Sequence, residues 1–164
     1  MDNAAERSGV STRVIMWLAG AQDVRIDVTH CGTPQARLTL AWEVAHLGFT
    51  AADQVAMMAD EVRESHGVGV VLPEVVSPRL IHGAPEDMGP LPVAVVTFHE
   101  PKTVQAIPGG TGRGRWVDLQ TGYLYLRITD RRGLRSLTDI LNRAETLAAA
   151  ALPATSTPRR TRTH

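Results

Sequence analysis

The residue types best suited to binding an anion gather in the loop 109–115, Gly-Gly-Thr-Gly-Arg-Gly-Arg. Backbone amides that glycines leave uncovered can surround an anion, and Arg113 and Arg115 add positive charge. The loop does not match a P-loop, because no Gly-Lys-Ser/Thr follows, nor a dinucleotide-binding turn, because a strand pattern follows it. It therefore predicts either contact with phosphate or nucleic acid, or a flexible entry into the next strand.

The segment 115–129 predicts a β-hairpin with two unlike faces. Residues 115–120 and 123–129 alternate between apolar and polar side chains, and Thr121-Gly122 between them suits a tight turn. Pairing Gln120 with Tyr123 places the aliphatic side chains on one face. These are Val117, Leu119, Leu124 and Leu126. The opposite face then carries Trp116, Asp118, Gln120, Tyr123, Tyr125 and Arg127.

This aromatic face has two interpretations. Trp116, Tyr123 and Tyr125 beside Arg127 form a platform on which nucleic-acid bases can stack. Alternatively, the aromatic side chains are buried under a second layer or dock a partner protein. The C-terminal helix can cover only one face of the hairpin, and we expect it on the aliphatic one. Which face is covered therefore bears on whether the hairpin binds a ligand.

Acid–base or metal chemistry has its candidates around a predicted buried strand. His99 and Glu100 follow the run 93–98, and ligands collect at such strand ends in open α/β sheets. His82, in the proline-rich connection 73–92, could fold over them. Their spacing matches no metal motif, so we predict no metal and no cofactor. A small hydrolase-like enzyme or a metal-binding protein would need a pocket that encloses His99 and Glu100.

Two helical patterns must position these groups. The C-terminal helix, about 134–151, repeats apolar residues at spacings of three and four, and it starts from a cap at Asp130 or Ser136. The central helix, about 50–66, has Val55, Met58 and Val62 on one side. Pro153 ends the C-terminal helix.

Strand patterns fill most of the remaining chain. Residues 24–28 and 36–44 alternate around a turn at 31–35, and apolar runs at 68–72 and 93–98 suggest buried strands, with another at 103–107. A hairpin followed by a helix would then occur twice, as a loose structural repeat. The rival interpretation, a helix over 34–47 within a DNA-reading helix-turn-helix, is disfavoured because helix 50–66 presents mostly acidic side chains to a phosphate backbone. Whether 34–47 is strand or helix stays open.

These patterns predict an α+β fold, with a mixed or antiparallel sheet of β-hairpins packed by the two helices. We expect a flexible N-terminus at 1–10, a single domain over 11–152 and a disordered basic tail at 153–164. The N-terminus lacks the apolar stretch of a signal peptide, and no run reaches the length of a membrane span. One cysteine, Cys31, fits a reducing compartment. A cytoplasmic protein without membrane contact is expected.

Charge is unevenly distributed along this neutral chain. Residues 1–100 carry thirteen acids against six arginines, and residues 101–164 carry ten arginines and Lys102 against four acids. The structural explanation is that the charges of the two halves neutralise each other in the fold. The functional one is a basic surface that attracts an anionic partner.

We therefore expect a non-enzymatic accessory or regulatory protein that contacts a nucleic acid or an acidic protein through its arginine-rich C-terminal third. The alternative is a protein–protein interaction module that uses the aromatic hairpin face, and the oligomeric state stays open. The run Asp27-Val-Thr-His30, with the turn and alternating strand that follow, is similar to uncharacterised proteins of actinobacterial mobile elements. That similarity covers a few residues and identifies no family. The arginine-rich composition is typical of GC-rich coding.

Overall fold

The structure is a computed structural model that describes residues 13–43, 45–69, 71–74 and 94–153. The predicted flexible N-terminus 1–10, almost all of the basic tail 153–164 and the candidate His82 lie outside the described residues.

The described chain contains four strands and a helix, twice in succession. The first set is β1 (Val14–Leu18), β2 (Arg25–Thr29), β3 (Arg37–Ala41), β4 (Ala45–Phe49) and α1 (Ala52–Glu64), followed by the short α2 (His66–Gly69). The second set is β5 (Ala94–Phe98), β6 (Val104–Gly109), β7 (Trp116–Thr121), β8 (Leu124–Ile128) and α3 (Arg131–Ala151), with a short 3-10 turn η2 (Gly112–Gly114) before β7. The predicted α+β fold, with sheets packed by a central and a C-terminal helix, is confirmed.

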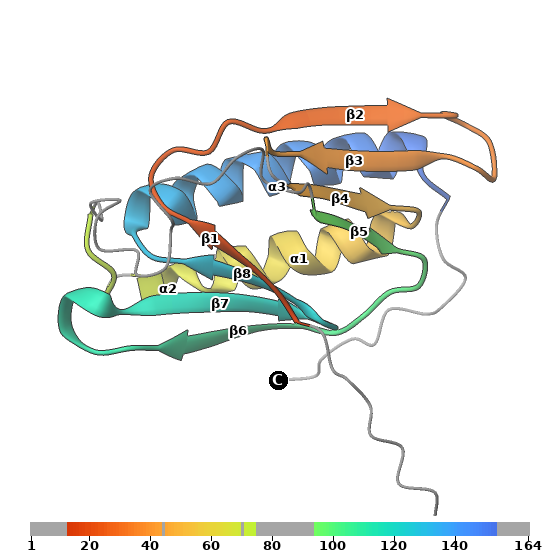
Figure 1. Cartoon of the computed structure of the whole chain (residues 1–164). Coiled ribbons are helices and arrows are strands. Elements are labelled where there is room, and N and C mark those ends of the chain that lie inside the picture. Colours follow the sequence, from red (N-terminus) through yellow and green to blue (C-terminus); the bar gives the residue numbers. More distant parts are fainter. Residues whose placement is uncertain (1–12, 44, 70, 75–93, 154–164) are drawn as a thin grey trace, which may run out of the picture.

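The strands form two four-stranded mixed sheets, in the orders β2-β3-β4-β5 and β1-β8-β7-β6 (Figure 1). Within each sheet, three consecutive strands form an antiparallel meander, β2-β3-β4 or β6-β7-β8. The fourth strand joins the last strand of the meander in parallel. Because tight turns cannot connect parallel strands, this fourth strand must come from a distant part of the chain.

The fourth strand of each sheet comes from the other repeat. β1 opens the first repeat but pairs with β8 of the second, and β5 opens the second repeat but pairs with β4 of the first. The registers agree, since Leu18 lies opposite Ile128 as Phe98 lies opposite Phe49. Position 18 thus corresponds to position 98, so the opening strand recurs after 80 residues. The predicted structural repeat is present, with its first strands exchanged.

Equivalent hydrogen bonds hold the two exchanged strands. The backbone N–H of Thr129 (3.1 Å) and its hydroxyl (3.3 Å) both donate to the carbonyl oxygen of Leu18. At the corresponding place, the N–H of Thr50 (3.3 Å) and its hydroxyl (3.1 Å) donate to the carbonyl oxygen of Phe98. Each exchanged strand is therefore fastened at its end to the residues just before the other repeat's helix.

A second pair of bonds lies a few residues beyond each exchanged strand. The N–H of Gln22 donates to the hydroxyl oxygen of Ser136 in α3, at 2.8 Å. The N–H of Lys102 donates to the side-chain carbonyl of Gln54 in α1, at 2.5 Å. In both cases the chain leaving one repeat's first strand is tied to the helix of the other repeat.

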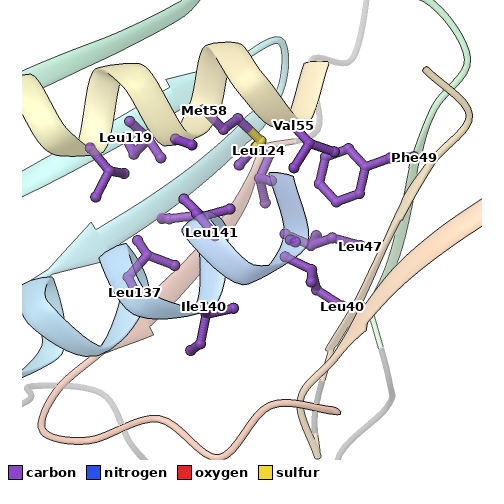
Figure 2. Close-up of a cluster of buried hydrophobic side chains, with 14 of the residues drawn as sticks. Leu40, Leu47, Phe49, Val55, Met58, Leu119, Leu124, Leu137, Ile140 and Leu141 are labelled. Carbon is purple, nitrogen blue, oxygen red and sulfur yellow. The ribbon is translucent and has the colours of Figure 1, made fainter. Parts of the chain in front are cut away.

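Both long helices pack between the aliphatic faces of the sheets and against each other. α1 contacts β4, β6 and β7, whereas α3 contacts β8, β2 and β3, so each helix bridges both sheets. Figure 2 shows their side chains meeting those of both sheets. The fully buried members drawn there include Leu40, Leu47, Phe49, Val55, Met58, Leu119, Leu124, Leu137 and Leu141. Burial of apolar surface stabilises a fold by about 25 cal/mol per Å². Because both repeats contribute to this one core, each repeat depends on the other for that stabilisation.

The two helices run antiparallel, and a polar contact joins them at the surface. Arg63, near the end of α1, donates to Asn142 (2.6 Å) and Glu145 (2.9 Å) in the middle of α3. Hydrogen bonds to Glu145 and Asp60 raise the pKa of the Arg63 guanidinium above its ordinary value.

The structure corrects several sequence-based expectations. Within 34–47, residues 37–41 form β3 and residues 45–47 begin β4, so the helix-turn-helix alternative is wrong. The described residues of the run 68–72 form no strand, because residues 68 and 69 belong to α2 and Leu72 is buried in the core. α3 begins at Arg131 and not at 134, since the Asp130 carboxylate caps it by accepting the N–H of Gly133 at 2.6 Å. No helix among the described residues is long and apolar enough to cross a membrane.

The strand exchange predicts that the two repeats assemble without a covalent link. We expect chains 1–83 and 84–164, produced together, to purify as a one-to-one complex that unfolds in one cooperative step, because each completes the other's sheet. Each chain produced alone should lack a cooperative thermal transition by circular dichroism. A first chain carrying Leu18→Asp is the control and should not assemble. Two chains that stay apart and melt cooperatively would contradict the exchange.

Candidate functional site

The outer face of the sheet β1-β8-β7-β6 carries most of the side chains that the sequence singles out. Residues 117, 119, 124, 126 and 128 point to the helices and are buried, so their neighbours along each strand point outward. The outward side chains are Arg13, Ile15 and Trp17 in and before β1, Tyr125 and Arg127 on β8, Trp116, Asp118 and Gln120 on β7, and Gln105 and Ile107 on β6. In the described part of the chain, both helices contact this sheet from its aliphatic side. The predicted aliphatic face is thus covered, and the aromatic face carries partly exposed side chains.

Arg127 lies at the centre of this face and is held from three sides. Its Nε and Nη2 donate to the two carboxylate oxygens of Asp118, both at 2.8 Å. Its guanidinium carbon lies 4.9 Å from the ring centroid of Trp17 and 4.4 Å from that of Trp116. The hydrogen bond with Asp118 raises the pKa of Arg127, against the opposing effect of partial burial. Each cation–π contact adds roughly 0.5–1 kcal/mol at a partly exposed site.

Strand register places these groups in one row across all four strands. Trp17 lies opposite Arg127, Arg127 opposite Asp118, and Asp118 opposite Ile107. The row therefore runs from an aromatic side chain, through an ion pair, to an aliphatic one. Trp17 is 43% exposed and Ile107 is 40% exposed, so both ends of the row stay open to contact.

The glycine loop after β6 is packed against Trp116. A Cβ atom on Gly109 would lie 2.6 Å from the indole nitrogen of Trp116, and one on Gly110 would lie 2.6 Å from the same ring. Gly110 also has a φ of +70°, and its Cβ would meet the carbonyl oxygen of Gly114 at 2.1 Å. These two glycines are explained by the close approach of the ring and the tight turn. Their presence therefore does not itself indicate an anion cradle.

The remaining predicted residues lie at the ends of the face. Arg113 and Arg115 belong to the exposed turn around η2, and neither has an ion-pair partner among the described residues. Tyr123 is 72% exposed and sits in the β7–β8 turn, because Thr121 pairs with Leu124 and not Gln120 with Tyr123. Gln120 lies opposite Tyr125, so the sequence-based register is wrong by two residues, which leaves each side chain on its predicted face. Tyr125 stays on the face.

The other repeat has an equivalent outer face with different side chains. Its register matches position by position, so Thr97, Gly48, Thr39 and Asp27 occupy the row of Trp17, Arg127, Asp118 and Ile107. None of these four is aromatic or aliphatic, and the only aromatic side chain facing outward there is His46. Two faces of the same backbone design therefore carry very different chemistry. The aromatic–arginine row is not a requirement of the fold.

A separate pocket of about 350 Å³ contains the candidate catalytic residues His99 and Glu100. It lies between the ends of β1 and β5 and the β7–β8 turn, and Lys102 and Tyr123 line it with them. His99 and Glu100 are exposed, and the nearest charge pair is Glu100 with Lys102 at 3.9 Å. Among the described residues, no group of three or more histidine, cysteine or acidic side chains could hold a metal ion. Thus the pocket exists, but the described side chains do not form a nucleophile–base pair or a metal site in it.

Sequence reasoning missed the contribution of β1 to the candidate site. Arg13, Ile15 and Trp17 alternate outward on this strand, and the Arg13 guanidinium carbon lies 5.8 Å from the ring centroid of Tyr125. The alternation was visible in the sequence. Its partner, β8, lies more than 100 residues away, and no local pattern encodes that pairing.

The Arg127–Asp118 pair should stabilise the fold measurably. Asp118→Ala leaves a partly buried guanidinium without its hydrogen-bond partner, so we expect the free energy of unfolding in urea to fall by about 2 kcal/mol. Asp118→Ala combined with Arg127→Ala should cost about 1 kcal/mol less than the two single changes added together. The control is the exposed pair Arg25–Asp27, whose removal should cost about 0.5 kcal/mol or less. Additive effects at 118 and 127 would show that the pair is not coupled.

Two glycines in the same loop should respond differently to alanine. Gly112→Ala meets open space but needs a positive φ of 55°, so it should cost about 1–2 kcal/mol. Gly110→Ala has the same backbone requirement and also meets the Gly114 carbonyl oxygen and the Trp116 ring, so we expect a further cost of about 1–3 kcal/mol. Urea unfolding gives both values, and near-ultraviolet circular dichroism should change for Gly110→Ala alone. Equal effects at both positions would contradict the packing of Trp116 on this loop.

No family model, no curated protein and no solved structure matches the chain.

Proposed function

We propose that this chain is a non-enzymatic accessory or regulatory protein that binds a partner through the outer face of the sheet β1-β8-β7-β6. This aromatic face, whose outward side chains include Arg13, Trp17, Trp116, Tyr125 and Arg127, combines tryptophan, tyrosine and arginine. These three residue types dominate the binding energy of protein interfaces. The proposal merges the two expectations from the sequence, an arginine-rich contact and an aromatic interaction face.

The observation that carries the proposal is the contrast between the two equivalent faces. Both sheets have the same strand order, register and anchoring hydrogen bonds, yet only one has Trp17, Arg127, Asp118 and Ile107 in its central row. Exposed apolar side chains contribute little to the stability of the fold. Gathered on one face, they are typical of an interaction site.

The face is also held rigidly before any partner arrives. Trp116 is packed between the Gly109–Gly110 backbone and the Arg127 guanidinium, which is itself fixed by Asp118. Side chains that are already ordered lose little conformational entropy on binding. A preorganised aromatic cluster therefore contributes more of its contact energy to affinity.

A selection from displayed random dodecapeptides tests this proposal. We expect the full-length protein to enrich peptides whose binding weakens at least about tenfold in Trp17→Ala, as for a central interface residue. Ile15→Ser, a change at a side chain that is 45% exposed, should weaken binding without affecting the fold.

Each variant has a control at the corresponding position of the other sheet. Thr97→Ala matches Trp17→Ala, and Val95→Ser matches Ile15→Ser on a side chain that is 68% exposed. Both controls should bind selected peptides as the unmodified protein does. Enrichment of peptides that is insensitive to Trp17→Ala and Ile15→Ser, or no enrichment at all, would overturn the proposal.

A further inference from the structure

We infer that the partner of the aromatic face is an acidic polypeptide segment that lies extended obliquely across the strands. This inference rests on the proposed function and names the chemistry of its partner. It concerns the charges at the two ends of the face and the side chains left open between them.

Positive charge is in excess on this face. Among the outward side chains of its four strands and of the loop 110–115, Asp118 is the only acid. Its carboxylate is already bonded by Arg127 through both oxygens. The charges of Arg13, Arg113 and Arg115 remain without an acidic partner in the described chain. An acidic segment would supply the negative charges that pair with these arginines.

The unpaired arginines lie at opposite ends of the strands. β1 and β8 run parallel, so Arg13, just before β1, lies at the end of the sheet where β8 begins. The turn with Arg113 and Arg115 joins the end of β6 to the start of β7, and these lie at the end where β8 finishes. β8 has five residues, which corresponds to a length of about 17 Å. Because Arg13 lies at the β1 edge and the turn lies between β6 and β7, the path between them also crosses two to three strand spacings of about 4.8 Å each, and an extended segment of about seven residues could reach both cationic ends.

The middle of the face suits apolar side chains. Ile15, Trp17 and Ile107 are each at least 40% exposed and lie between the two cationic ends. A segment that alternates acidic and apolar residues would bury its apolar side chains here and place its acids near the arginines.

Nucleic acid fits the same face less well. Base stacking requires a free aromatic face, whereas Trp116 lies between Arg127 and the glycine backbone, and Trp17 also contacts Arg127. The forked donors of Arg127, which suit a phosphate, are engaged by Asp118. The Trp116 ring and the forked donors of Arg127, which lie at the centre of the face, are therefore already engaged within the protein.

The test sequences the peptides that the full-length protein selects from the random dodecapeptide library at about 50 mM and about 500 mM salt, where screening is weak and strong respectively. At low salt we expect aspartate and glutamate to be enriched at least about threefold over the unselected library. Replacing the acids of a selected peptide by their amides should weaken its binding about tenfold at low salt and much less at high salt.

The triple variant Arg13→Gln, Arg113→Gln and Arg115→Gln should lose the preference for acidic peptides, while it still binds the amide peptide. Its control is Arg25→Gln with Arg37→Gln, two arginines that face outward on the other sheet, which should keep the preference. A fluorescent twelve-nucleotide oligothymidylate serves as the nucleic-acid probe and should bind more weakly than the selected peptides.

The outcomes separate this inference from the proposed function. Peptides that depend on Trp17 but show no acidic enrichment would overturn the acidic partner and leave the binding face standing. Tighter binding of oligothymidylate than of any selected peptide would show that the partner is a nucleic acid and not a polypeptide. No Trp17-dependent binding of any probe would overturn both.

Discussion

Each repeat of this chain lacks one strand of its own sheet and receives it from the other repeat. Parallel pairing makes the exchange possible, because a parallel neighbour need not be close in sequence. The strands β1 and β5 are held by matching bonds from Thr129 and Thr50 to the carbonyl oxygens of Leu18 and Phe98. Helix packing and the shared core follow from this arrangement, since each helix contacts both sheets. Two equivalent parts thus share one hydrophobic core.

The candidate binding face also depends on the exchange. Trp17 belongs to the first repeat, whereas Arg127, Asp118 and Ile107 belong to the second. Without β1 beside β8, Arg127 would lose one of its two flanking rings and the face would lose three outward side chains. The proposed binding surface therefore forms only when the two repeats are assembled.

Local patterns predicted the elements well and their assembly poorly. The alternation over 115–129 predicted β7 and β8 and their two faces, and the period of 3.6 predicted α1 and α3. The hairpin register was wrong by two residues, because glycine at 122 suits more than one turn position. The exchange was not visible, since corresponding residues are alike at few positions, such as the buried Leu40 and Leu119. For the site, Trp116, Tyr125 and Arg127 were predicted on one face, but Trp17 required the pairing of β1 with β8, and the bonding of Asp118 to Arg127 required the correct register of β7 with β8.

The second outer face, with Thr97, Gly48, Thr39 and Asp27 in its central row, has a consequence for how such a protein can change. A duplicated backbone lets one copy bear a specialised surface while the other copy keeps an ordinary one. Substitutions on the ordinary face leave the specialised face untouched, because the two lie on separate sheets. That face is consequently an independent position at which a second specificity could arise. A chain of this design could become bivalent without gaining a single residue in length.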